Sequence, residues 1–159
     1  MQEIRVKRGW SYGAGCALRR SRADHWFEIH LAPSIDVTAD ALALTLGLYE
    51  QLRDGGLTAD EIDFAKSYLT GSLPFHVATA RQRMGVAVRH ACFGLPGDFV
   101  ATLPERLMAV TEGEVQAVIE RWIRPEDLTS VVVTTAAAIS DALASAGAGA
   151  PEVVAYDSY

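Results

Sequence analysis

The chain opens on a cationic run that passes through a glycine into small and aromatic residues: Ile-Arg-Val-Lys-Arg-Gly-Trp-Ser-Tyr-Gly-Ala-Gly at positions 4–15. The mixture of small and aromatic residues over 10–18 predicts a β-strand with room for close backbone approach. Arg5 is a permanent cation with a fork of donors, and Tyr12 carries a phenol that can donate a hydrogen bond. Positioned donors of this kind stabilise a developing oxyanion. Spacing alone favours the alternative, in which Arg5 is a solvated charge and Tyr12 a half-buried strand aromatic.

A second strand is expected over residues 25–31, where apolar and polar side chains alternate after a polar turn. This stretch holds His25, Glu28 and His30, one position away from the zinc motif His-x-x-Glu-His. In a strand His25 and Glu28 lie on opposite faces, which leaves only Glu28 and His30 together. A catalytic zinc requires three protein ligands. We therefore expect no metal site in this chain.

Helices are predicted in the middle of the chain, over residues 38–53, from Thr58 to Gly71, over 78–93, from Thr102, and over 112–123. Two of them begin with a capping box, Thr58 with Glu61 and Thr111 with Glu114. The β-branched run at 128–135 predicts a third strand. Residues 136–159 are expected to form a tail with a short helix at 140–145 and an extended end.

Strands at both ends of a run of helices indicate an α+β fold, an antiparallel sheet with helices packed on one face. Three strands make a small sheet for so many helices, so we expect that further strands complete it and that this chain is a truncated domain. An open sheet edge of this kind can pair with another copy, which would give a homo-oligomer.

Charge and composition exclude some classes of partner. The chain has 159 residues and a net charge of −6, yet residues 1–22 carry six basic groups and one acid. A basic strand region on an acidic body favours an anionic ligand, but the aromatic interleaving and overall basic character of nucleic-acid binders are missing. The sequence has no run of about 18 apolar residues, so no membrane helix is predicted. No signal peptide is visible. The two cysteines, Cys16 and Cys92, are expected to be reduced and buried.

Four stretches, in order, resemble the second, zinc-free half of insulinase-type (pitrilysin-like) zinc metallopeptidases. They are Arg-x-Lys-x-Gly-x-Ser-Tyr at 5–12, Gly-Leu-Thr-Ala-Asp-Glu-Ile-Asp-Phe-Ala-Lys at 56–66, Gly-Ser-Leu-Pro at 71–74 and Val-Thr-Glu-Gly-Glu-Val-Gln at 110–116. Each is weak alone, but the ordered set is fairly specific. The resemblance covers roughly residues 4–135.

The resemblance implies a truncated half-domain of the LuxS/insulinase-like metallopeptidase fold, with an inactive half-domain over residues 1–135 and a C-terminal tail over 136–159. In that family an Arg and a Tyr seven residues apart approach the zinc site of the other half, where they bind the substrate backbone and the oxyanion. Arg5 and Tyr12 keep this spacing and become the candidate catalytic and substrate-binding residues, and Arg8 is less suited. Zinc is expected in a partner half, on the same longer chain or on a separate subunit, and not in this chain.

Two other functions stay open. One is that of an inactive structural or assembly subunit with the same fold. The other is that of a peptide-binding module that uses an open sheet edge for strand addition. A neighbouring chain or domain with His-x-x-Glu-His would favour the enzyme. The composition, rich in Ala, Arg and Gly and without Asn, suggests a bacterial gene, and the resemblance leaves periplasm and cytoplasm open.

Overall fold

The computed structural model describes residues 2–158 and confirms the α+β class. The chain divides into two compact units. Met1–Asp54 with Arg124–Tyr159 form the first, here called the sheet unit, and Gly55–Ile123 form the second, here called the helical unit.

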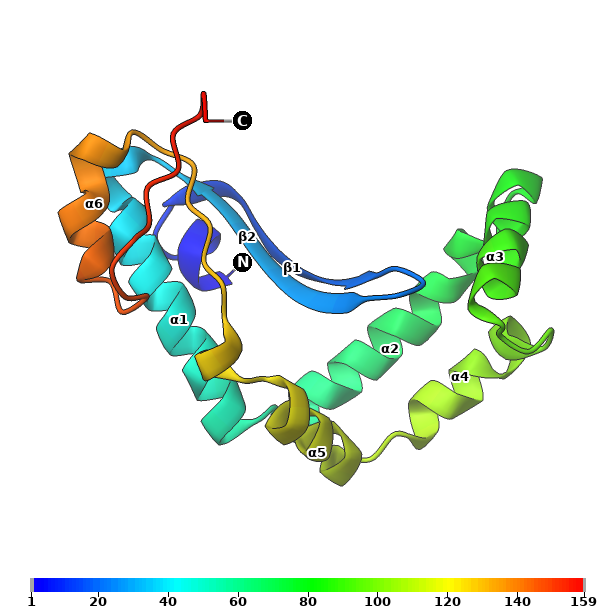
Figure 1. Ribbon diagram of the computed structural model, residues 1–159. Helices are drawn as coiled ribbons and strands as arrows, with labels where there is room; N and C mark the ends of the chain where they lie inside the picture. The colour runs from blue at the N-terminus through cyan, green and yellow to red at the C-terminus, as the bar shows by residue number, and fades with distance from the viewer. Residues whose placement is uncertain (1, 159) are drawn as a thin grey trace. The chain divides into compact units, whose positions relative to one another are not determined.

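The sheet unit contains both strands and several helices, and the helical unit contains helices alone (Figure 1). The elements of the sheet unit are η1 (Gln2–Val6), β1 (Ser11–Arg20), β2 (His25–Pro33), η2 (Ile35–Val37), α1 (Thr38–Gly55), η3 (Pro125–Asp127) and α6 (Ala136–Ala144). Those of the helical unit are α2 (Ala59–His76), α3 (Ala80–Phe93), α4 (Phe99–Ala109) and α5 (Glu112–Trp122). Within residues 2–158 no helix is long and apolar enough to cross a membrane.

The predicted hairpin is present as the antiparallel pair β1 and β2. Its apolar face is built from opposed pairs such as Leu18 with Phe27 and Cys16 with Ile29. The Phe27 ring stacks on Tyr49 of α1 with 6.2 Å between ring centroids. This contact places α1 against the apolar face, as the alternation in the sequence predicts.

The core of the sheet unit is small. Ala41 and Tyr49 of α1 are buried, as are Ile139 and Leu143 of α6. Ile139 and Leu143 are four residues apart and therefore share one helix face. α6 begins at Ala136, earlier than the helix expected at 140–145.

The third predicted strand is wrong, because residues 128–135 pair with no other strand in the described part of the chain. Leu128 donates its backbone N–H to Pro125 at 3.3 Å, within the turn of η3. Residues 128–133 instead line a groove of about 660 Å³ together with β2 and α1. The β-branched composition favours extended backbone, but a strand forms only where a second edge supplies hydrogen bonds.

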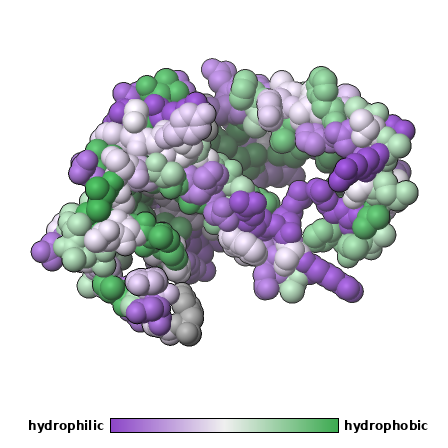
Figure 2. All heavy atoms as spheres, turned by 90° about the horizontal axis from the view of Figure 1, so that it is seen from above, coloured by the Kyte–Doolittle hydropathy of each residue, from purple (hydrophilic) through white to green (hydrophobic). Residues whose placement is uncertain are grey.

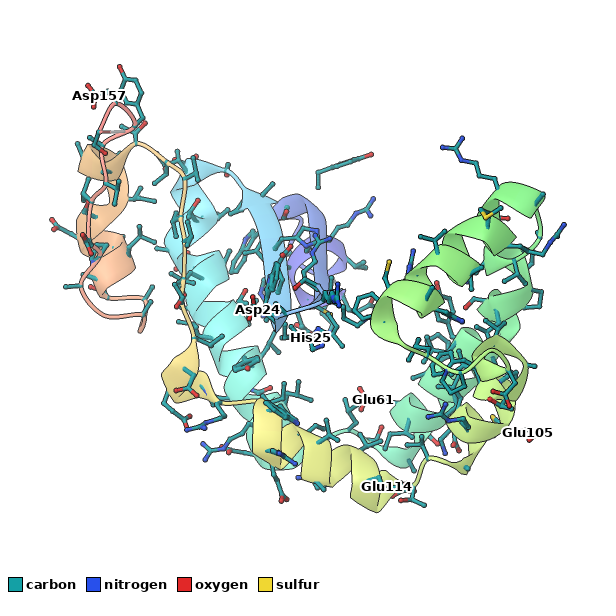
Figure 3. All side chains as sticks on the ribbon, turned by 45° about the vertical axis from the view of Figure 1, so that its right-hand side comes forward. Asp24, His25, Glu61, Glu105, Glu114 and Asp157 are labelled. Carbon is teal, nitrogen blue, oxygen red and sulfur yellow. The ribbon has the colours of Figure 1, made fainter. Side chains whose placement is uncertain are left out.

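The helical unit confirms both predicted capping boxes and adds one. Thr58 with Glu61 and Thr111 with Glu114 exchange side-chain and backbone hydrogen bonds at the starts of α2 and α5. Figure 3 labels Glu61 and Glu114 at these helix starts. The box formed by Thr79 and Gln82 at the start of α3 was not predicted. The sequence pattern for this box was present, since Thr79 and Gln82 are three residues apart and Gln can replace Glu as the third residue of the helix.

Two helix boundaries differ from the prediction. α2 continues through Gly71 and Pro74 to His76, because a proline near a helix end removes one hydrogen bond without reversing the chain. α4 begins at Phe99, and Thr102 lies inside it with its hydroxyl donating to the Asp98 carbonyl at 3.2 Å. The expected burial of the cysteines is also wrong, since both thiols are exposed.

Replacing Gly56 by Ala is expected to destabilise the helical unit by about 1–2 kcal/mol. Gly56 has a φ of +66°, and an added Cβ would lie 2.1 Å from Oε1 of Gln116. Urea unfolding measures the change. Gly71→Ala is the matched control, because Gly71 lies inside α2 with open space around it, and it should stabilise by about 0.5–1 kcal/mol. Equal stability of the two variants would contradict the requirement for glycine at position 56.

The capping boxes predict an acid-sensitive stability. Hydrogen bonds from the backbone and side chain of Thr58 lower the pKa of Glu61 below its ordinary 4.5, and Thr111 lowers the pKa of Glu114 in the same way. Each glutamate binds its proton more weakly in the folded state than in the unfolded state. The stability that its ionised form contributes is therefore complete above pH 4.5 and is lost as the pH falls through the lowered folded-state pKa.

Urea midpoints measured between about pH 3 and 6 test this dependence. The Thr58→Ala variant should lose less stability on acidification than the wild type, because Glu61 then has little pKa difference between folded and unfolded states. Thr134→Ala is the control, since Thr134 is exposed and caps no helix in the described chain. A Thr58→Ala curve parallel to the wild-type curve would contradict the linkage.

Candidate functional site

Arg5 and Tyr12, which the sequence singled out, lie together in the structure. Arg5 is in η1 and Tyr12 near the start of β1. The guanidinium carbon of Arg5 lies 5.3 Å from the centroid of the Tyr12 ring, within the range of a cation–π contact. Both side chains reach solvent, and Tyr12 is 90% exposed. A cation and a phenol are thus presented side by side on one surface of the sheet unit.

The backbone before β1 brings Arg5 to this position. The cationic run forms a helical turn that precedes the strand expected from residue 10 onward. Gly9 closes the turn with a φ of +65°, a conformation that favours glycine. The N–H of Gly9 donates to the Arg5 carbonyl at 3.1 Å, and the N–H of Trp10 donates to the Ile4 carbonyl at 3.0 Å. Ile4 is buried and anchors the turn.

Glu3 separates the three cations of this turn into two groups. Its carboxylate accepts hydrogen bonds from Lys7 and from Arg8, the latter at 2.7 Å. These bonds, first that of Lys7 and then that of Arg8, lower the pKa of Glu3. No carboxylate between residues 2 and 158 lies within 4.0 Å of the Arg5 guanidinium. Arg5 is therefore the cation of the turn that is available to an external anion or carbonyl oxygen.

Tyr12 is aimed by an irregularity in the hairpin. Ser11 lies opposite Pro33 and Ala14 opposite Leu31, so Tyr12 and Gly13 share a single partner residue on β2. Two residues facing one define a β-bulge, which turns a side chain out of the regular alternation. The bulge was not predicted, although a glycine inside a strand is one of the signals of a bulge.

The Ser11 hydroxyl bridges this bulge. It accepts a hydrogen bond from the N–H of Ala32 at 2.9 Å and donates one to the carbonyl of Gly13. Ser11 is only 4% exposed, so its hydroxyl is directed at these two backbone groups and not at solvent. Ser11 was visible in the sequence as part of the motif at 5–12, but no role was predicted for it.

The histidine-rich strand is arranged differently from a zinc site. Glu28 accepts two hydrogen bonds from Arg19, at 3.0 and 3.1 Å, and they lower its pKa. His30 lies across from Gly15, with its ring next to the glycine backbone. His25 begins β2 beside the hairpin turn (Figure 3) and faces away from Glu28, as predicted. No group of three or more metal-donor side chains occurs within residues 2–158.

The exposed pair has a limited chemistry by itself. Hydrogen-bond donors stabilise a developing oxyanion strongly only where water is excluded. At 90% exposure the Tyr12 hydroxyl competes with solvent. The pair therefore requires a second surface over it before it can contribute to catalysis.

Fold and site together define an α+β chain that presents an Arg–Tyr pair from the start of a hairpin. The chain is similar to a protein named non-peptidase homolog YmxG from Helicobacter pylori, with 26% identity over 134 residues. The alignment covers 84% of this chain and 31% of that protein, so the chain spans about a third of the length of the curated relative it matches. No protein-family model matches the chain.

Proposed function

We propose that this chain is a non-catalytic half of an insulinase-type zinc metalloendopeptidase and that it supplies Arg5 and Tyr12 to the zinc site of a partner half. The contact between the Arg5 guanidinium and the Tyr12 ring carries the proposal. Its support is the division of charge over residues 3–8, where Lys7 and Arg8 pair with Glu3 and Arg5 stays available.

In this proposal the two halves divide the chemistry. The partner half holds the zinc, which would supply a Lewis acid and an activated water for attack on the peptide bond. Arg5 binds the peptide backbone through its forked donors, and the Tyr12 hydroxyl donates to the carbonyl oxygen as negative charge develops on it. Closing the partner over the pair removes the water that now surrounds Tyr12.

Exposed apolar side chains support the need for a partner surface. Phe64 and Tyr68 stack on each other on α2 with 6.4 Å between ring centroids, and both are exposed. In the space-filling view apolar side chains reach the surface between polar ones (Figure 2). Apolar groups that gather at a surface commonly mark an interface.

A second candidate function is that of an inactive structural or assembly subunit. The H. pylori relative is named a non-peptidase homolog, which favours an inactive chain. Both candidates give the isolated chain no peptidase activity. They differ in whether the Arg–Tyr pair takes part in the reaction of the partner.

Reconstitution tests the proposal. Peptide hydrolysis is measured for this chain, for a zinc-bearing half with His-x-x-Glu-His, and for the mixture, with the zinc content of each. The proposal expects hydrolysis that depends on both halves, with zinc only in the partner half. Hydrolysis by this chain alone would overturn it, and so would a formed complex whose rate equals that of the zinc-bearing half alone. The second of these results would favour the assembly subunit.

A further inference from the structure

We propose that Ser11 is the positioning residue of the Arg–Tyr pair: its buried hydroxyl holds the β-bulge that turns Tyr12 toward Arg5. The relevance of this role to catalysis rests on the proposed function. The positioning itself concerns only this chain and can be tested without a partner.

The ladder register shows what the bulge changes. Ala14 lies opposite Leu31 on the apolar face that α1 covers. If the ladder continued without a bulge, Gly13 would face Ala32 and Tyr12 would face Pro33. Because side chains alternate with a period of two, Tyr12 would then point to the same face as Ala14. The extra residue moves it to the other side of the hairpin, where it is 90% exposed and meets Arg5.

The hydrogen bonds of Ser11 stabilise the bulged register in particular. A bulge interrupts the ladder and leaves backbone groups without their regular partners. Here the Ser11 hydroxyl accepts from the N–H of Ala32 on β2 and donates to the carbonyl of Gly13 on β1. Both bonds flank Tyr12, since its neighbours on either side are Ser11 and Gly13. Without the hydroxyl the N–H of Ala32 and the carbonyl of Gly13 lose the group that links them across the bulge, and the regular register becomes competitive.

The hairpin also offers a matched control at its other end. The Ser21 hydroxyl accepts from the N–H of Asp24 and donates to the Asp24 carbonyl, both at 2.9 Å. It therefore bridges backbone groups in the turn as Ser11 does in the bulge. Removing it weakens the hairpin without touching the register at Tyr12.

NMR of the full 159-residue chain tests the proposal. The ring current of Tyr12 shifts the side-chain protons of Arg5, and Tyr12→Leu defines their position without the ring. Ser11→Ala should move these signals to the Tyr12→Leu position at a temperature where circular dichroism shows a folded chain. Ser11→Thr, which keeps a hydroxyl, should retain the wild-type shift, and so should Ser21→Ala.

A folded Ser11→Ala variant with the wild-type Arg5 shift would overturn the proposal, because the bulge would then persist without the hydroxyl. Equal loss of the shift in Ser21→Ala would overturn it as well, because general weakening of the hairpin would explain the effect. If Ser11→Ala does not fold, Ser11→Cys replaces it, since a thiol keeps the size and hydrogen-bonds only weakly. The same loss of the Arg5 shift is expected, and retention would count against the proposal.

Turnover of the reconstituted enzyme then separates this role from the proposed function. If Ser11 acts through Tyr12, the Ser11→Ala/Tyr12→Phe double variant should be no slower than Tyr12→Phe alone. Additive losses would contradict action through Tyr12. Unchanged turnover in Tyr12→Phe would remove the proposed function and leave the NMR result on Ser11 intact.

Discussion

Replacing Tyr12 by Phe is expected to lower kcat of the reconstituted peptidase by about 10²–10³-fold, the usual effect of removing one donor from an oxyanion site. The substitution deletes only the hydroxyl. The ring remains, so the stacking of the Arg5 guanidinium at 5.3 Å should survive. Steady-state kinetics on a peptide, with the complex verified by gel filtration, measure the change. KM should change much less than kcat, because the hydrogen bond strengthens as charge develops.

Arg5 in η1 and Arg8 in the turn that follows it give this prediction an internal control. Arg5→Lys keeps the charge and loses the planar fork of donors, so it should also reduce kcat/KM. Arg8→Lys should have little effect, because Arg8 already donates to Glu3 and lies 5.4 Å from the Trp10 ring. Equal losses in both variants would show that the charge of the turn, and not the Arg–Tyr pair, affects turnover.

Wild-type kcat in Tyr12→Phe, with the complex intact, would contradict a role for the hydroxyl. That result would favour the second candidate function, an inactive structural or assembly subunit. Loss of the complex itself would be seen by gel filtration and would indicate a structural effect of the substitution.

Local patterns predicted much of the fold. The capping boxes of α2 and α5 depend on residues three apart, and the sequence places them correctly. The hairpin follows from the period-two alternation over 25–31, which also placed His25 and Glu28 on opposite faces. In each case the interactions that determine the structure lie within a few residues of one another or on one repeating face.

The remaining features depend on contacts that local patterns do not contain. The run at 128–135 has strand composition, yet no edge within residues 2–158 pairs with it. The bulge at Tyr12 depends on a hydrogen bond between Ser11 and Ala32, which are 21 residues apart. The turn of η1 depends on Gly9 at positive φ and on burial of Ile4. The seven-residue spacing of Arg5 and Tyr12 was visible in the sequence, but the geometry that joins them was not.

Replacing Tyr49 by Ala is expected to destabilise the sheet unit by about 3–5 kcal/mol, as truncation of a buried aromatic does. Tyr49 is 6% exposed and is the one aromatic side chain among the buried residues of the described chain. Its ring also stacks on Phe27 and holds β2 on α1, so truncation removes this contact as well. Urea unfolding followed through the indole NMR signal of Trp26, which lies on β2, reports this unit.

Tyr68→Ala is the matched control for this truncation, because Tyr68 lies on the 18-residue helix α2 and is 66% exposed. Its loss should change stability by no more than about 0.5 kcal/mol. Equal effects of the two variants would contradict the assignment of Tyr49 to the core. A large effect at Tyr49 has a further consequence for the site: β2 carries Ala32, the partner of Ser11, so detaching β2 from α1 should also release Tyr12 from Arg5. In Tyr49→Ala the Arg5 signals should therefore reach their unstacked position at a lower urea concentration than in the wild type, and in step with the Trp26 transition.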